Sequence, residues 1–351
     1  MFDRPYRDQQ RDALPGLSGD PEFTEAMLSL GAPINPAQHD VLRQAADFAI
    51  GHWRVSSTPS ESLLADTPHE DVPAHATLEQ LGLLQEIKPP RSTYDHTLID
   101  GGTLPVCCYR LAYFQSLQER GFQAGYITMF GGQRLRLPQD GDVELFATQL
   151  YENATPWFRG WIDSELAKPR NPDDPWTRSF ATEHEIAILA LLHQFGGMLE
   201  HVGTVARTAA ESIDPRIPPA SVQAELFQVG TTRVAVLNAP AVIRVIFGTP
   251  LPAEESRPNG ESCFYEWLRL ADPQPDATVL SLTHNPNIYR TWLDLQKAAL
   301  KAGRSDLVLE GCGAAIEAGR PYGYVLRALA RITFGLCGLR ELLKAAPVQQ
   351  P

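Results

Sequence analysis

The sequence predicts an α/β protein with a Rossmann-like, mostly parallel sheet flanked by helices, an N-terminal extension and a helical insertion. From residue 94 onward, short apolar segments that end in glycine alternate with helical segments. This alternation is typical of parallel strands joined by crossover helices. Polar or glycine-rich residues follow four of the predicted strands, as at the ligand edge of such a sheet. The chain of 351 residues is 43% hydrophobic, which suffices for a large core.

Residues 1–93 are interpreted as a partly helical N-terminal extension. Helices are expected near residues 36–52 and 77–87. Asn35 and Pro36 supply an N-cap and a first helical residue for the former. The segment between the two helices is rich in Ser, Thr, Pro and acidic residues, so it predicts a surface loop.

Residues 94–154 are interpreted as the first half of the α/β core. A strand is predicted in YDHTLIDGG and a second strand in AGYITMFGGQ. The helix between them, PVCCYRLAYFQSLQERG, closes at Gly121. A further helix is predicted in DVELFATQLYENA.

Residues 155–228 interrupt the alternation and are interpreted as a helical insertion. One long helix is expected over residues 183–212, because apolar residues from Ile188 to Val202 recur at the spacing of one helix face. Gly196–Gly197 would kink this helix or let it pack closely.

Residues 229–351 are interpreted as the second half of the core with a C-terminal helix. Strands are expected in RVAVLNAP, TVLSLTHN and SDLVLEGCGA, with a weaker candidate in VIRVIFGTP. Helices are expected near residues 260–271, 288–303 and 322–346.

Composition narrows the class of protein. The net charge of -12 and the absence of a Lys/Arg run argue against a nucleic-acid binder. No uninterrupted stretch of about 18 apolar residues occurs, so no membrane span is expected. The charged N-terminus lacks the apolar segment of a signal peptide, which favours a cytoplasmic protein. Five scattered cysteines without a C-x-x-C pair indicate neither zinc nor a disulfide framework.

A ligand site is predicted where four strands end in polar or glycine-rich residues. If these strands are parallel, their ends face one edge of the sheet, where ligands bind in open α/β folds. The residues at these ends are Asp100, Gly101, Gly102, Thr103, Gly131, Gly132, Arg134, Asn238, Thr283 and His284.

The chemistry of this edge suits an anion. Glycines allow a ligand to approach the backbone N–H groups, and helix N-termini offer a positive dipole end. Arg134 and Arg290 would add bidentate contacts to a phosphate or carboxylate. Alternatively, the glycine pairs serve only to make tight βα turns.

Other polar residues complete the predicted site. Thr283, Asn259 and Asn287 would orient the ligand, although Asn259 equally suits a helix cap. Asp100 and Glu144 are the candidate acid/base carboxylates. Each of the two also suits a solvated turn or a first helical turn.

Several familiar sites are disfavoured. The chain has no G-x-G-x-x-G after a strand, no P-loop, no G-x-S-x-G and no H-E-x-x-H. His184, His193 and His201 are nine and eight residues apart, so no i,i+4 ligand pair forms. They are interpreted as polar-face residues, and no metal is predicted.

The segments resemble the DUF218 superfamily of Rossmann-type α/β proteins (YdcF-, SanA- and ElyC-like). TLIDGG and ITMFGGQR resemble its two glycine-rich strand ends, and Glu144 falls near its downstream acid. RPNGESC resembles its Asn-led helix start, with Asn259 kept. LTHNPNIYR resembles its late segment, with Thr283 and Arg290 kept and Asn287 in the position of its histidine.

The resemblance covers roughly residues 94–153 and 232–314. It implies a Rossmann-like core with a polar pocket at the strand ends, in a superfamily with members linked to envelope or lipid-carrier metabolism. One member is reported to bind S-adenosylmethionine. The histidine and glutamate of the superfamily pattern are absent here, so its catalytic chemistry is not carried over.

Three functional hypotheses follow. The first is a cytoplasmic enzyme, a transferase or hydrolase, that acts on a small phosphorylated or nucleotide-like metabolite. The second is a non-catalytic ligand sensor or pathway partner, for which a protein partner or homo-oligomer is open. The third is S-adenosylmethionine binding, ranked lower because the second strand ends in FGGQ without the acid that often holds a ribose.

Overall fold

The computed structural model describes most of the chain, in two compact units. The described residues are 21–30, 32, 41–53, 72–132, 135–136, 140–169, 171, 177–208, 221–239, 260–316 and 322–345. Unit 1 comprises Met1–Pro89, Thr283–Leu300 and Glu310–Pro351, and unit 2 comprises Pro90–Leu282 and Lys301–Leu309.

A seven-stranded sheet has the strand order β3-β4-β5-β2-β1-β6-β7. β1 pairs in parallel with both β2 and β6, and β5 pairs in parallel with β2. The antiparallel strands β3 and β4 lie at one edge. The predicted mostly parallel α/β fold is therefore confirmed. The strands are β1 (Thr93–Ile99), β2 (Gln123–Gly132), β3 (Leu199–Thr208), β4 (Ser221–Val229), β5 (Thr232–Ala239), β6 (Thr278–His284) and β7 (Val308–Ala314).

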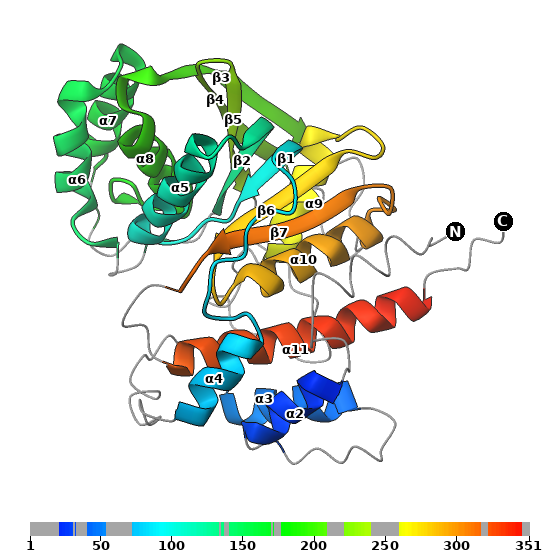
Figure 1. Cartoon of the computed structure of the whole chain (residues 1–351). Coiled ribbons are helices and arrows are strands. Elements are labelled where there is room, and N and C mark those ends of the chain that lie inside the picture. The colour runs from blue at the N-terminus through cyan, green and yellow to red at the C-terminus, as the bar shows by residue number, and fades with distance from the viewer. Residues whose placement is uncertain are drawn as a thin grey trace. The chain divides into compact units, whose positions relative to one another are not determined.

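Among the helices of unit 2, α8 and α9 pack on its strands. α5 lies against α8, and α6 contacts both α7 and α8, so these four helices form one group (Figure 1). The helices are α5 (Leu104–Glu119), α6 (Val143–Leu150), α7 (Pro156–Leu166), α8 (Glu183–Phe195) and α9 (Gly260–Ala271).

The end of β2 shows that α8 and α9 cover opposite faces of the sheet. The ring of Phe130 contacts Phe264 of α9, with centroids 5.0 Å apart. The next residue, Gly131, lies against the backbone of His184 in α8. Since successive residues of a strand point to opposite faces, the two helices lie on different sides.

The crossover helix between β1 and β2 begins and ends close to the residues that the sequence predicts. α5 carries a proline in its first turn, where a missing N–H costs least. It buries Leu111, Phe114 and Leu117. Gly121 follows the helix with φ of 91°, a conformation that glycine adopts at low cost.

The expectation of one long helix over residues 183–212 is wrong. α8 ends at Phe195, and Gly196 follows it with φ of 52°. The chain then enters β3, where β-branched residues such as Val202 and Thr204 favour the extended backbone. The glycine pair therefore ends the helix, and residues 199–208 and 221–229 extend the sheet.

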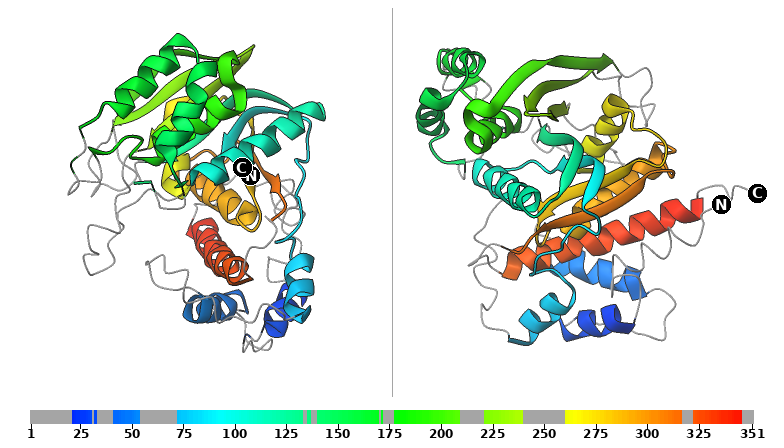
Figure 2. Two further views of the ribbon diagram at one scale, coloured as in Figure 1. Left: turned by 90° about the vertical axis from the view of Figure 1, so that its left-hand side faces the viewer. Right: turned by 45° about the horizontal axis from the view of Figure 1, so that its top comes forward.

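Unit 1 has a helical core of its own. Met27, Ala45, Leu78, Trp292 and Leu329 belong to one buried apolar cluster. α11 runs alongside α3 (Figure 2). The helices that contribute to it are α2 (Pro21–Ser29), α3 (Val41–Trp53), α4 (Val72–Gln80), α10 (Ile288–Lys301) and α11 (Tyr322–Ala345).

The N-terminal predictions are confirmed in part. α3 accounts for the helix expected near 36–52. Its predicted start at Asn35 and Pro36 lies outside the described residues. The strand candidate at 242–250 lies outside them as well. The helix expected at 77–87 is wrong beyond Gln80, because α4 ends there and Gly82 has φ of 71°. α2 was not predicted. No helix in the described ranges is long and apolar enough to cross a membrane.

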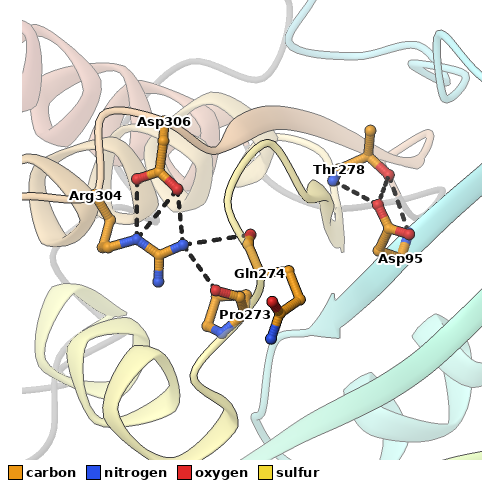
Figure 3. Close-up of polar contacts among 6 residues, drawn as sticks. All are labelled: Asp95, Pro273, Gln274, Thr278, Arg304 and Asp306. Atoms are coloured by element: carbon orange, nitrogen blue, oxygen red, sulfur yellow. Dashed lines mark hydrogen bonds and ion pairs between the residues drawn. The ribbon is translucent and has the colours of Figure 1, made fainter.

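Two polar clusters tie together chain segments near the start of β1 and β6 (Figure 3). The Asp95 carboxylate accepts hydrogen bonds from the backbone N–H of Thr278 at 2.8 Å and from its hydroxyl at 2.7 Å. Arg304 donates to both carboxylate oxygens of Asp306, with the shortest hydrogen bonds at 2.8 and 2.9 Å, and to the Pro273 carbonyl at 2.8 Å. These hydrogen bonds lower the pKa of both carboxyl groups.

We expect Asp306→Asn to flatten the acid dependence of stability. The folded pKa of Asp306 lies below its unfolded value of about 3.9, so its pairing stabilises fully above that pH. This stabilisation is lost as the pH falls through the folded pKa. Denaturant unfolding should therefore show that the difference in free energy of unfolding between wild type and Asp306→Asn becomes smaller as the pH falls from about 5 to about 2. Asp47→Asn, in an exposed pair with Arg43, is the control; a pH-independent gap would contradict the prediction.

Candidate functional site

The carboxyl ends of β1, β2 and β5 in unit 2 lie at one edge of the sheet. Ile99 of β1 is in register with Met129 of β2. Gly131 of β2 is in register with Asn238 of β5. Asp100 therefore leaves β1 at the level where β2 reaches its glycine pair, which brings three of the four predicted strand ends together.

A buried arginine holds the turn from β1 into α5. Arg110 is 3% exposed and donates from one guanidinium nitrogen to the carbonyls of Asp100, at 2.7 Å, and Gly101. A second nitrogen lies 3.6 Å from the Asp100 carboxylate. The charge of Arg110 is therefore engaged by the turn itself.

The sequence reasoning missed Arg110, although a signal was present. Arg110 lies three residues after Cys107 and four before Phe114, which are both buried residues of α5. A charged residue at that spacing faces the core and requires a buried partner. Such a position after a glycine turn points to the backbone carbonyls of the turn.

The amino terminus of α5 is bound by a carboxylate of the protein itself. Asp140, which is 6% exposed, accepts a hydrogen bond from the backbone N–H of Leu104 at 2.6 Å. The N-terminus of a helix favours a negative charge, because its backbone N–H groups are free and the helix dipole is positive there. Asp140 therefore occupies the position in which an anionic ligand would bind. Thr103, the N-cap residue of α5, makes no side-chain cap hydrogen bond.

The glycines at this edge are required by close packing of the chain. A Cβ atom on Gly101 would lie 2.2 Å from the Phe130 carbonyl oxygen. One on Gly131 would lie 2.6 Å from the Cα atom of His184. A Cβ on Gly102 would lie 2.9 Å from the side chain of Val106 and 3.5 Å from the Arg110 guanidinium, which are side-chain atoms. These distances favour the alternative interpretation, in which the glycines permit tight turns and packing.

Glu144 forms a bidentate ion pair. Both of its carboxylate oxygens accept hydrogen bonds from Arg136, each at 2.9 Å. The backbone N–H of Arg136 donates to the Ala181 carbonyl at 2.8 Å, so Arg136 connects α6 with the residues before α8. This geometry is typical of a structural ion pair, and an acid/base role for Glu144 stays a prediction.

The cysteines near the turn are poor nucleophiles. Burial raises the pKa of the Cys107 thiol well above its usual value, although nearby Arg110 acts in the opposite direction. Burial raises the pKa of Cys108 to about 11. Since the thiolate is the reactive form, neither residue suits covalent catalysis at neutral pH.

The predicted polar residues after Leu282 belong to unit 1, where they build a buried turn. Asn285 is fully buried and its amide donates to the carbonyls of Gly82, at 2.9 Å, and Gln85. Its backbone N–H donates to Ala314 at 2.9 Å. Thr283 and His284, which complete β6, are buried as well. This turn is thus fastened within unit 1 by its own hydrogen bonds.

Asn287 and Arg290 also have partners within unit 1. The Asn287 side-chain amide donates to the Tyr324 hydroxyl at 2.9 Å, and the Asn287 backbone carbonyl accepts from the Thr291 N–H at the start of α10. Arg290 lies 3.9 Å from the Asp294 carboxylate, one helical turn away. Both sets of contacts favour a structural role, and ligand contacts by these residues stay predictions.

Arg134 and Asn259 lie outside the described residues, as does the side chain of Asn238. Gly132 ends β2 directly before this gap. Within the described ranges, no three His, Cys, Asp or Glu residues gather as a metal site would require.

The comparisons with known proteins give no relative. No protein-family model, curated protein or solved structure matches the chain.

Proposed function

We propose that this chain is an enzyme that binds a small anionic metabolite, phosphorylated or nucleotide-like, at the carboxyl ends of β1 and β2. The observation that carries the proposal is the strand order. β2 and β5 lie on one side of β1 and β6 lies on the other, so the order reverses between β1 and β6, and β1 borders the reversal. In open α/β sheets, ligands bind beyond the carboxyl end of the strands at such a reversal. The DUF218 resemblance implies the same pocket.

Within this pocket, Asp100 is the proposed acid/base residue. Its side chain is 30% exposed, so it can reach a ligand while Arg110 holds the turn beneath it. Asp140 already accepts the hydrogen bond from the first N–H of α5, so a ligand anion cannot take that position. Arg134 would therefore make the main contact with the anion. The backbone of Gly101 and Gly102 would border the ligand.

A thermal-shift screen tests the proposal. The compounds are nucleotides, sugar phosphates, prenyl phosphates and S-adenosylmethionine. A compound present at about 100 times its dissociation constant should add about 2.7 kcal/mol of stability. We expect Arg134→Ala to abolish the shift, Asp100→Asn to abolish turnover, and Arg120→Ala, at an exposed end of α5, to change neither. No shift with any compound, or full binding by Arg134→Ala, would refute the anion site.

A non-catalytic ligand sensor or pathway partner is the second candidate. The observation in its favour is that Glu144 is engaged by Arg136 and Asp140 by α5, which leaves fewer carboxylates for chemistry. Saturable binding without any product in mass spectrometry would support this candidate. A shift with S-adenosylmethionine alone would instead favour use of that cofactor.

A further inference from the structure

Glu225 is the centre of a polar cluster on the face of the sheet that α8 covers. Its carboxylate lies 2.7 Å from the Nε2 atom of His201 and accepts a hydrogen bond from the Thr204 hydroxyl at 2.8 Å. Thr204 of β3 is its direct neighbour across the antiparallel pair. The His201 ring also stacks on Trp157, with centroids 4.0 Å apart. These contacts fix both the carboxylate and the imidazole.

The sheet register connects this cluster with the proposed ligand edge. Glu225 is in register with Val236 of β5, which is in register with Met129 of β2. Met129 precedes Gly131 by two residues on the same face of β2. Measured along the strands, Glu225 therefore lies about 6.6 Å before the level of Gly131. The backbone of His184 lies over Gly131. His184 therefore lies over the level of Gly131, and Glu225 lies at the level of Met129, two residues earlier along β2.

His184 differs from an ordinary polar-face histidine. It is half-buried, and its Nδ1 atom is buried with no hydrogen-bond partner in the part of the chain that the structure describes. An imidazole nitrogen in such a position normally has a partner. The backbone contact with Gly131 places the residue at the edge itself, in the first turn of α8.

Charged groups from several elements surround His184. Glu183 and Glu185 flank it on α8, and Glu185 accepts hydrogen bonds from Thr182. Glu225 of β4 also acts electrostatically on His184, and His201 lies 2.7 Å from the Glu225 carboxylate. Burial lowers the pKa of His184 below its usual value, while Glu185 and Glu225 act in the opposite direction. The imidazole is therefore mainly neutral at pH 7 and able to accept a proton.

We propose that His184 is a second proton-transfer residue of the ligand site, in addition to Asp100, and that Glu225 stabilises its imidazolium form. His184 would take a proton from a ligand hydroxyl or a bound water and become an imidazolium, whose charge Glu225 balances. His201 and Thr204 hold the Glu225 carboxylate in place. A carboxylate that stabilises an imidazolium is a recurrent arrangement in acid–base catalysis. The inference rests on the proposed function, since a proton-transfer residue requires the ligand site.

Modification of the full-length protein by diethyl pyrocarbonate, followed by peptide mass spectrometry, tests the assignment. We expect His184 to react in the folded protein, with a pH midpoint below the ordinary histidine value of about 6.5. Glu225→Gln should move this midpoint to still lower pH, because it removes a negative charge that favours the imidazolium. Glu200→Gln, an exposed position of β3, should leave it unchanged. If Glu225→Gln does not fold, Thr204→Val should move the midpoint to higher pH, because the Glu225 carboxylate loses a hydrogen-bond donor that offsets its negative charge.

The outcomes separate this inference from the proposed function. An unreactive His184, or a midpoint insensitive to both Glu225→Gln and Thr204→Val, would overturn the inference. The second arm adds the compound that gives the largest thermal shift, and protection of His184 by that compound supports the assignment. A stabilising compound without protection overturns the role of His184 and leaves the ligand site standing. If no compound stabilises the protein, both proposals fall.

Discussion

Replacing Arg110 with alanine should lower the free energy of unfolding by about 3 kcal/mol or more. The guanidinium donates to two backbone carbonyls of the β1–α5 turn and lies beside the Asp100 carboxylate. A hydrogen bond to a charged group contributes about 1.5–3 kcal/mol, and buried acceptors left without donors add a desolvation cost. Arg110→Lys should recover only part of the loss, because an ammonium group cannot reproduce the planar fork. Denaturant unfolding measures both variants.

Arg120→Ala is the matched control for this prediction. Arg120 follows the same helix but is exposed, and it bonds locally to Ser116. Its removal should change the free energy of unfolding by no more than about 0.5 kcal/mol. Equal effects of the two substitutions would show that Arg110 does not hold the turn.

The alternation of strands and helices was predictable because its signals are local. The turn after β1, the closure of α5 at Gly121 and the end of β2 are each marked by glycine within a few residues. Parallel pairing then brings the ends of β1, β2 and β5 to one edge, whatever side chains they carry. The sheet and the shared edge formed by these strand ends follow from these two facts.

The prediction of one long helix was wrong for an equally physical reason. The apolar residues from Ile188 continue at helical spacing into β3, so periodicity alone cannot show where the helix ends. The end depends on the positive φ of Gly196, and β3 is stabilised by its pairing with β4. Strand pairing is a tertiary effect, and a single segment does not reveal it.

The engagement of the charged residues was the least predictable feature. Asp140 is 36 residues from the α5 N–H that it binds, and Glu144 is paired with Arg136, eight residues before it. Such contacts depend on where loops return in space, which spacing does not specify. Arg110 is the exception, because its place on the buried face of α5 is visible in the sequence.

Gly101→Ala should lower the free energy of unfolding by about 3 kcal/mol, the upper end of the usual range for overpacking. The added Cβ would lie 2.2 Å from the Phe130 carbonyl oxygen, a backbone atom that cannot rotate away. The β1–α5 turn must therefore move away from the end of β2, which also displaces the carbonyls that Arg110 binds. Thermal and denaturant unfolding should both report the loss.

Gly160→Ala separates this steric effect from the general consequences of replacing glycine. Gly160 is exposed in the middle of α7, and a Cβ there would meet no atom within 4 Å. Alanine at an exposed helical site stabilises by roughly 0.5–1 kcal/mol relative to glycine, so the two substitutions should act in opposite directions. If Gly101→Ala also stabilised the protein, the turn would have room for a side chain. Its glycine would then have a use other than packing, such as the close approach of a ligand.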